Sequence, residues 1–227
     1  MQTGYELVIA SSIATVFLSS IIGAYLGRKW YSQDVRLLTD LPLVFAIAFV
    51  TQAFNIMIVT LQHIGLLDSS MIFFRVRSIA IGGSVIPILG ALLQIWAPSI
   101  QRLHNRLVYL LTIYWASIAL FGPNEELIMI STIPVMVILG IMMIATFIIT
   151  WKTGRLKEVR SELMVVSVLF GLASQVLRVP LLSTSLFFMP DILLTISMIV
   201  TAVAFANPWY KRETNSRPDE PPQMIPI

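Results

Sequence analysis

The sequence predicts an all-α protein, a polytopic membrane bundle of seven transmembrane helices. The chain of 227 residues is 57% hydrophobic and only 12% charged, about half the charged fraction of a soluble domain. Seven apolar runs approach the ~20 residues that a helix needs to cross a bilayer, and together they take up most of the chain. Helices are expected in them because an open sheet would leave backbone groups unpaired in lipid.

The predicted spans are separated by short polar segments. No Lys or Arg precedes the first run, which begins at Glu6, so we expect a permanent span rather than a signal peptide. Asp40 and Glu162 precede the second and sixth runs, where a carboxylate caps a helix start. The fourth run is the shortest. The expected spans are Glu6–Gly27, Leu41–Gln62, Ser78–Trp96, Leu107–Phe121, Leu127–Trp151, Leu163–Leu182 and Pro190–Pro208.

Lys and Arg predict the orientation, because cytoplasmic loops of membrane proteins are enriched in them. An outside N-terminus and a cytoplasmic C-terminus place 12 of the 15 basic residues in the cytoplasm. Residues 1–206 then form the membrane domain, and the polar, proline-rich residues 207–227 form a flexible cytoplasmic tail. The cytoplasmic basic residues are Arg28, Lys29, Arg36, Arg102, Arg106, Lys152, Arg155, Lys157, Arg160, Lys211, Arg212 and Arg217.

The first and last thirds of the membrane domain share an order of features. The segment Glu6–Ser11 aligns with Glu126–Ser131, Trp30 with Trp151, and Gln52 with Gln175. This order predicts a 3+1+3 plan, with a first repeat over about 6–97, a linker helix over about 105–121 and a second repeat over about 126–206. One intervening span leaves both triplets in the same orientation, so the repeats would be parallel.

This layout resembles that of the microbial rhodopsins and of the SWEET and PQ-loop transporters. The likeness covers the whole chain in topology, and it implies a seven-helix bundle around a small-molecule site. Two features depart from these families. The positions of the Pro-Gln signature read Thr51-Gln52 and Ser174-Gln175. The segment Leu186–Asp191 resembles an opsin seventh helix, but Thr195 stands where the retinal-binding lysine would be, so a covalent retinal is not expected.

Polar residues within the spans are the candidates for a ligand site, because such residues are costly in lipid. Gln52 and Asn55 share one face of span two, and Gln175 and Arg178 have the same spacing in span six. If the repeats are real, these two pairs face each other near the midplane. The alternative is interhelical hydrogen bonding that only stabilises the bundle. Ser84, in a glycine-containing stretch before Pro87, and Thr195 complete this candidate site.

Arg178 and Asp191 lie near the outer ends of spans six and seven, joined by a short hairpin. They are candidates for a charge clamp on a ligand, or for an ion pair that ties two helix ends, with Asp191 in a first helical turn after Pro190. Tyr114 and Trp115 in span four are candidates for a pocket lining, although amphipathic aromatic residues are also common near a membrane interface.

No catalytic or metal site is predicted. The chain has no cysteine and two histidines, and His63 and His104 fall on opposite sides of the membrane. No Gly-rich phosphate loop or metalloprotease motif occurs. We therefore expect neither an enzyme nor a cofactor, and no nucleic-acid partner.

Three functions fit the sequence. The first is a small-solute transporter with a polar site near the midplane. The second is an opsin-like receptor or sensor, without covalent retinal, that signals to a cytoplasmic partner. The third is a non-catalytic subunit of a larger membrane complex. In each case we expect a multi-pass protein of the cell membrane, in contact with lipid and with a small-molecule ligand or a protein partner.

Overall fold

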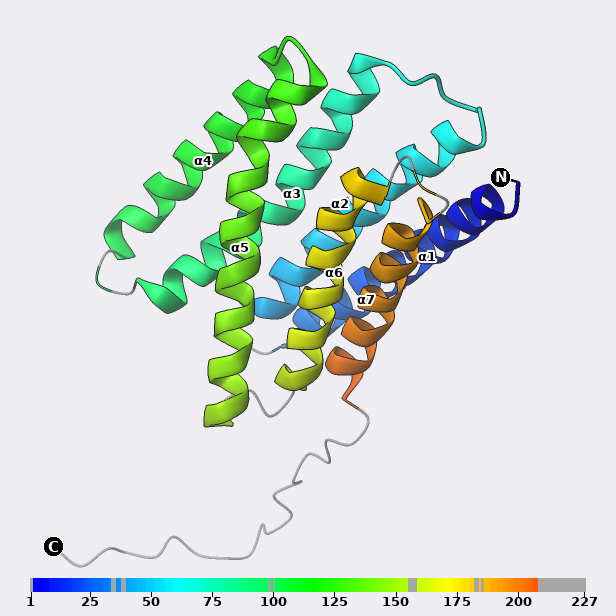
Figure 1. Ribbon diagram of the computed structural model, residues 1–227. Helices are drawn as coiled ribbons and strands as arrows, with labels where there is room; N and C mark the ends of the chain where they lie inside the picture. Colours follow the sequence, from blue (N-terminus) through cyan, green and yellow to red (C-terminus); the bar gives the residue numbers. More distant parts are fainter. Residues whose placement is uncertain are drawn as a thin grey trace, which may run out of the picture.

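Seven α-helices follow one another in the computed structural model, which describes residues 2–33, 36–37, 40–97, 99, 101–154, 159–181, 184 and 186–207 (Figure 1). No strand occurs within these residues. The all-α class and the number of helices are therefore confirmed, whereas the predicted tail lies outside the described residues from position 208 onward. The helices are α1 (Gln2–Tyr31), α2 (Leu41–His63), α3 (Met71–Trp96), α4 (Gln101–Phe121), α5 (Glu125–Thr153), α6 (Ser161–Leu181) and α7 (Met189–Ala206).

Five of these helices are long and apolar enough to cross a membrane: α1, α2, α3, α5 and α7. The fourth helix is not among them, because its first turns contain Arg102, His104, Asn105 and Arg106. In α6 the apolar stretch within the described residues is Ser161–Leu177. The five apolar helices identify a membrane protein, and spanning by α4 and α6 stays a prediction.

The third helix begins at Met71, well before the predicted Ser78. Arg75 and Arg77 interrupt the apolar run, but arginine is a good helix former and both side chains find partners on neighbouring elements. Arg75 Nη2 donates to the Gly122 carbonyl at 3.0 Å, and Arg77 Nε donates to Asn55 Oδ1 at 3.3 Å. Hydropathy alone therefore placed this helix start too late.

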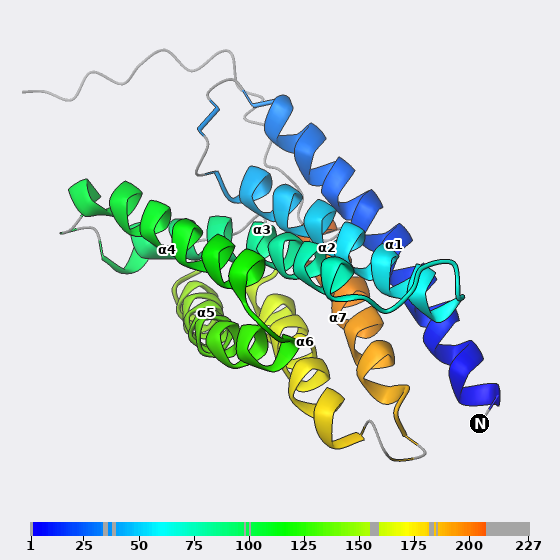
Figure 2. The ribbon, with the colours of Figure 1, turned by 90° about the horizontal axis from the view of Figure 1, so that it is seen from above.

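Six helices pack in a closed ring in the order α1, α2, α3, α5, α6 and α7, and α7 packs back against α1. The fourth helix lies outside the ring, mainly against α3 and to a lesser extent against α5. Seen from above, α1 and α4 therefore lie on opposite sides of the bundle (Figure 2). Helices that are neighbours in sequence are also neighbours in space, apart from the displacement of α4.

Phenylalanine side chains close the interior of the ring. Phe45 of α2 packs against Phe205 of α7 with ring centroids 5.2 Å apart, and against Phe147 of α5 at 6.5 Å. These three residues are buried, together with Met164 of α6 and Leu26 of α1. The core thus joins helices that lie across the ring from each other.

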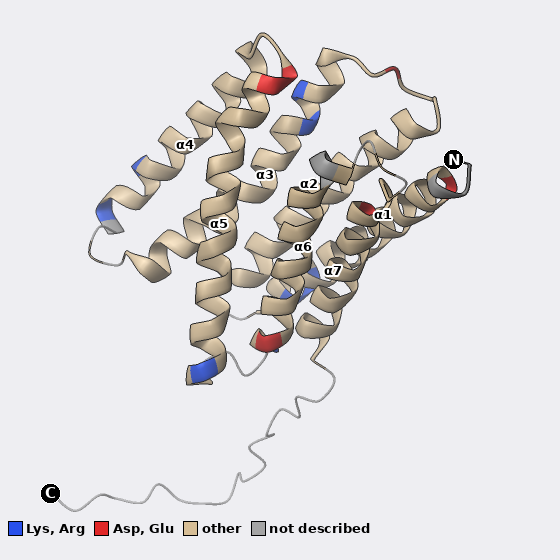
Figure 3. Cartoon of the chain, in the orientation of Figure 1, with Lys and Arg blue, Asp and Glu red and all other residues tan. Residues whose placement is uncertain are grey.

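Charged residues gather at the two ends of the bundle (Figure 3). The end at which α1, α3, α5 and α7 finish, and at which α2, α4 and α6 begin, is called the basic end below. The opposite end holds Arg75 and Arg77 but also most of the described acidic residues. The described basic residues that define the basic end are Arg28, Lys29, Arg36, Arg102, Arg106, Lys152 and Arg160.

The helix ends differ in part from the predicted caps. Asp40 occupies the N-cap position of α2 without a capping hydrogen bond, because its Oδ2 accepts instead from the Leu37 N–H at 2.9 Å. Glu162 lies in the first turn of α6 and pairs with Arg160 at 2.7 Å. The capping side chain of α5 is Asn124, which accepts from the Leu127 N–H at 2.9 Å.

The fourth helix is attached to α3 through Trp115. Its indole ring is 2% exposed, and its Nε1 donates to the Ser78 carbonyl at 2.8 Å. Gly82 of α3 provides the space for the ring, because a Cβ at that position would lie 2.6 Å from Trp115 Cδ1 and Nε1. Helix contacts of this kind depend on a small residue that lets the side chain approach the backbone.

We expect Gly82→Ala to destabilise the protein by about 1–3 kcal/mol, the usual range for overpacking a tight contact. Gly27→Ala is the matched control, because a Cβ there meets nothing within 4 Å, and alanine is the better helix former by about 1 kcal/mol. The measurement is the thermal unfolding midpoint of each variant in the same detergent. Equal midpoints for the two variants would contradict the tight α3–α4 contact.

Candidate functional site

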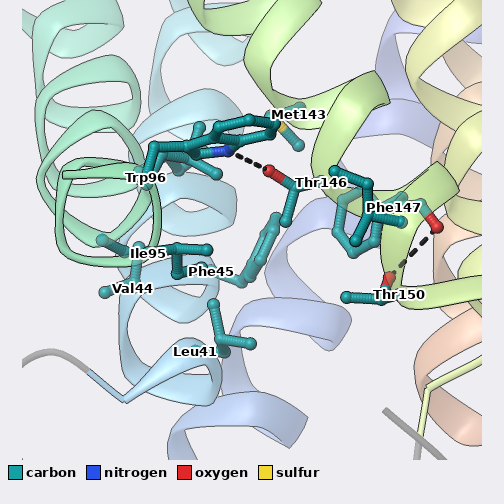
Figure 4. A pocket seen from close by; sticks show the side chains of 13 residues that line it. Leu41, Val44, Phe45, Ile95, Trp96, Met143, Thr146, Phe147 and Thr150 are labelled. Carbon is teal, nitrogen blue, oxygen red and sulfur yellow. Dashed lines mark hydrogen bonds between the residues drawn. The ribbon is translucent and has the colours of Figure 1, made fainter. Parts of the chain in front are cut away.

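A cavity of about 410 Å³ lies at the basic end of the bundle, between α2, α3 and α5 (Figure 4). Its size falls within the ~300–1,000 Å³ that is usual for small-molecule sites. Phe45 and Phe147 of the aromatic core also line it, so the cavity borders the filled centre of the ring. The lining consists of Leu41, Val44, Phe45, Ile88, Ala91, Leu92, Ile95, Trp96, Met143, Thr146, Phe147, Ile149 and Thr150.

The three polar side chains of this cavity already have partners. Trp96 Nε1 donates to Thr146 Oγ1 at 2.8 Å, and Thr146 Oγ1 donates to the Met142 carbonyl at 2.7 Å. Thr150 Oγ1 donates to Ser161 Oγ at 3.0 Å. The remaining lining is hydrocarbon or thioether, so the cavity favours an apolar ligand or the apolar part of an amphipathic one.

One side of the cavity continues into the exposed apolar surface. Three of its lining residues are themselves substantially exposed: Ile95 at 51%, Trp96 at 45% and Ile149 at 45%. They lie near the ends of α3 and α5, and these two ends diverge at the basic end of the bundle (Figure 1). The cavity is therefore open between α3 and α5.

The predicted polar pair on α2 contributes to the packing between helices. Asn55 is buried, and its Oδ1 accepts from Arg77 Nε of α3. Gln52, one turn earlier, is half-buried. Hydropathy does not predict the contact between Asn55 and Arg77, because the predicted third span begins only at Ser78. The sequence does hold a signal for this contact. Asn55 lies near the end of α2 and Arg77 near the start of α3, so the two residues lie at a similar depth on neighbouring antiparallel helices.

Ser84 of α3 also lies at a helix interface. Its Oγ lies 2.7 Å from Thr51 Oγ1 of α2 and donates to the Ala48 carbonyl at 3.0 Å. A hydroxyl that is engaged in this way joins two helices by the interhelical hydrogen bonding that was the alternative in the sequence. Ligand binding by Ser84 stays a prediction.

The predicted midplane site is not assembled in the described residues. Gln175 lies on the exposed side of α6, and α2 and α6 are not neighbours in the ring, so Gln52 and Gln175 do not face each other. The buried neighbour Ser174 donates to the Pro190 carbonyl at 2.7 Å. The side chain of Arg178 lies outside the described residues.

Asp191 and Thr195 occupy the first turns of α7. Asp191 follows the buried Pro190, where the helix dipole favours a carboxylate, as expected. The pairing of Asp191 with Arg178 stays a prediction. Thr195 Oγ1 lies 2.9 Å from Thr15 Oγ1 of α1 and donates to the Ser11 carbonyl at 3.2 Å. Thr195 therefore joins α7 to α1.

The two aromatic candidates of α4 have different environments. Trp115 is buried in the contact with α3, as described above, so it is a packing residue. Tyr114 is 43% exposed and donates from its hydroxyl to the Ser131 carbonyl of α5 at 3.1 Å. Neither of them lines the α2/α3/α5 cavity.

Histidine and carboxylate side chains do not converge on a metal site. Within the described residues, no group of three or more His, Cys, Asp or Glu side chains is placed to hold an ion. His104 is buried at the start of α4, with its Nε2 2.8 Å from the Ala97 carbonyl. The ring of His63 packs edge-on against Tyr5 at the opposite end of the bundle.

The chain was compared with protein-family models, with curated proteins and with solved structures, and no match was found in any of the three. The resemblance to the opsin and SWEET layouts therefore rests on helix number and order alone.

We expect a hydrogen bond between Thr51 and Ser84 to stabilise the α2–α3 contact by about 0.6 kcal/mol, the average for such bonds in a membrane. A double-mutant cycle with Thr51→Val and Ser84→Ala, measured by unfolding in mixed micelles, gives this coupling energy. Thr112→Val combined with Ser84→Ala is the control pair, because the Thr112 hydroxyl is exposed and donates only within α4. Additive effects in both pairs would contradict the assignment.

Proposed function

We propose that this protein is a membrane-embedded binding protein whose ligand occupies the α2/α3/α5 cavity. The observation that carries this proposal is the cavity itself, which is large enough for a small molecule and is lined by apolar side chains with satisfied polar groups. The ligand class is an apolar or amphipathic small molecule. This function is that of a non-enzymatic sensor, the opsin-like alternative without covalent retinal.

The charge distribution supports a signalling role for the basic end. The cavity lies at the end where Arg28, Lys29, Arg102, Arg106 and Lys152 gather (Figure 3). The positive-inside rule assigns this end to the cytoplasm and the N-terminus to the outside of a cell membrane. A ligand at this depth would lie next to a surface able to bind an acidic protein partner.

A transporter is the second candidate, and the shared order of features in the first and last thirds of the membrane domain favours it. If the ring is rotated by 180°, α1, α2 and α3 take the places of α5, α6 and α7. Each pair of neighbouring helices then coincides with another pair of neighbouring helices. The α1–α2, α2–α3 and α3–α5 contacts correspond to α5–α6, α6–α7 and α7–α1. Every closed ring of six helices has this property, so the ring is compatible with the 3+1+3 plan of parallel repeats that is found among transporters.

The ligand proposal predicts specific photolabelling of the cavity. Reconstituted protein is labelled with a diazirine-bearing fatty acid, and the labelled peptides are identified by mass spectrometry. We expect labels on the α3 and α5 peptides that line the cavity. Ala91→Leu should reduce them at least fivefold, because the larger side chain fills part of the space around the buried Ala91. Ala24→Leu on the exposed face of α1 is the matched control.

Two outcomes separate the candidates. Labels spread evenly over all lipid-exposed helices, and unchanged by Ala91→Leu, would refute a specific ligand site. The transporter candidate instead predicts solute-dependent labelling of single cysteines at positions 52, 84, 175 and 195 by water-soluble thiol reagents from both sides of the membrane.

A further inference from the structure

The two halves of the ring meet at two seams, the α1/α7 seam and the α3/α5 seam. The α1/α7 seam contains buried polar contacts deep in the bundle. Thr15 and Thr195 approach to 2.9 Å, and Ser19 Oγ lies 3.7 Å from the Met198 sulphur. Thr15 and Ser19 are almost fully buried, so this seam is tightly packed along the inner face of α1.

The α3/α5 seam is built differently. It is joined near the basic end by the hydrogen bond from Trp96 of α3 to Thr146 of α5. Both of its helices contain an internal proline, Pro87 in α3 and Pro134 in α5. Each proline removes a backbone hydrogen bond and allows its helix to bend. The tight seam has no such residue within α1, and in α7 the proline lies in the first turn.

The exposed side of the cavity coincides with this second seam. Ile95, Trp96 and Ile149 line the cavity and are also part of the exposed apolar surface of α3 and α5. In a bilayer such a surface favours contact with hydrocarbon, because exposing apolar side chains to water costs free energy. The opening is thus bordered by side chains that favour contact with lipid, and the Trp96–Thr146 hydrogen bond links the two helices on either side of it.

From this arrangement we infer that the ligand enters and leaves the cavity sideways, from the bilayer, through the α3/α5 seam. The Trp96–Thr146 hydrogen bond limits the width of the opening at this seam, and its rupture lets the ends of α3 and α5 separate further. The ligand is accordingly a molecule dissolved in the membrane, such as one with an alkyl or acyl chain. This inference rests on the proposed binding function and adds the route and the origin of the ligand.

The absence of native cysteine allows a direct test of the route. Met143→Cys places one thiol within the cavity. Reconstituted protein is treated with octyl methanethiosulfonate, which partitions into lipid, or with a trimethylammonium methanethiosulfonate added to both aqueous sides. We expect the octyl reagent to modify position 143 at least tenfold faster. Phe17→Cys on the exposed face of α1 gives the reference rate for a lipid-facing thiol.

The role of the hydrogen bond is tested in the same background. Trp96→Phe should accelerate octyl modification of position 143 about threefold, the factor supplied by an interhelical hydrogen bond of average strength in a membrane. Thr146→Val should give the same acceleration, because it removes the acceptor and retains the shape. Trp151→Phe, an exposed tryptophan at the end of α5, is the matched control and should leave the rate unchanged.

Faster modification by the charged reagent would overturn lateral entry and assign the cavity to an aqueous opening, with the photolabelling result for ligand binding unaffected. Unchanged rates in both Trp96→Phe and Thr146→Val would overturn the role of the hydrogen bond. Circular dichroism and the rate at the Phe17→Cys reference establish that each variant is folded and reconstituted.

Discussion

Packing of Phe45 against Phe147 and Phe205 is the contact on which the rest of the bundle depends. Lipid is as apolar as these side chains, so burial alone does not drive helices together in a membrane, and close packing has to do so. Phe45 touches helices on two other sides of the ring. It thereby prevents the ring from enclosing a continuous channel at this level and forms the inner boundary of the cavity.

Polar side chains within the bundle serve a second requirement, because hydroxyl and amide groups in lipid need partners. Ser84, Asn55 and Thr195 all have partners on a neighbouring helix. These three candidates for ligand binding therefore also connect neighbouring helices. The space that remains for a ligand is lined mainly by apolar side chains. Apolar residues occur throughout this sequence, so those that line the cavity cannot be recognised from the sequence alone.

The number of helices could be predicted from hydropathy because seven apolar runs alternate with polar segments along the sequence. The start of α3 could not be predicted in this way, because Arg75 and Arg77 are typical of a loop. Only the structure shows that their side chains donate to the Gly122 carbonyl and to Asn55 Oδ1. The cavity was also beyond prediction. The cavity arises from the divergence of α3 and α5 and from the small side chain of Ala91. No pattern of residues in the sequence indicates either feature. Gln52 and Gln175 matched in sequence, but Gln175 lies on the outer side of α6.

The contact between Thr15 and Thr195 joins positions 180 residues apart, which has a consequence for synthesis in the cell. At ~5–20 residues per second, α1 is made about 10–40 seconds before α7. During that interval the Thr15 hydroxyl has a partner within its own helix, the Ser11 carbonyl at 2.8 Å. Thr195 likewise donates to the Asp191 carbonyl at 2.9 Å. Each helix can therefore remain in the bilayer without an unpaired hydroxyl until its neighbour is inserted, so ring closure can be the last step of assembly.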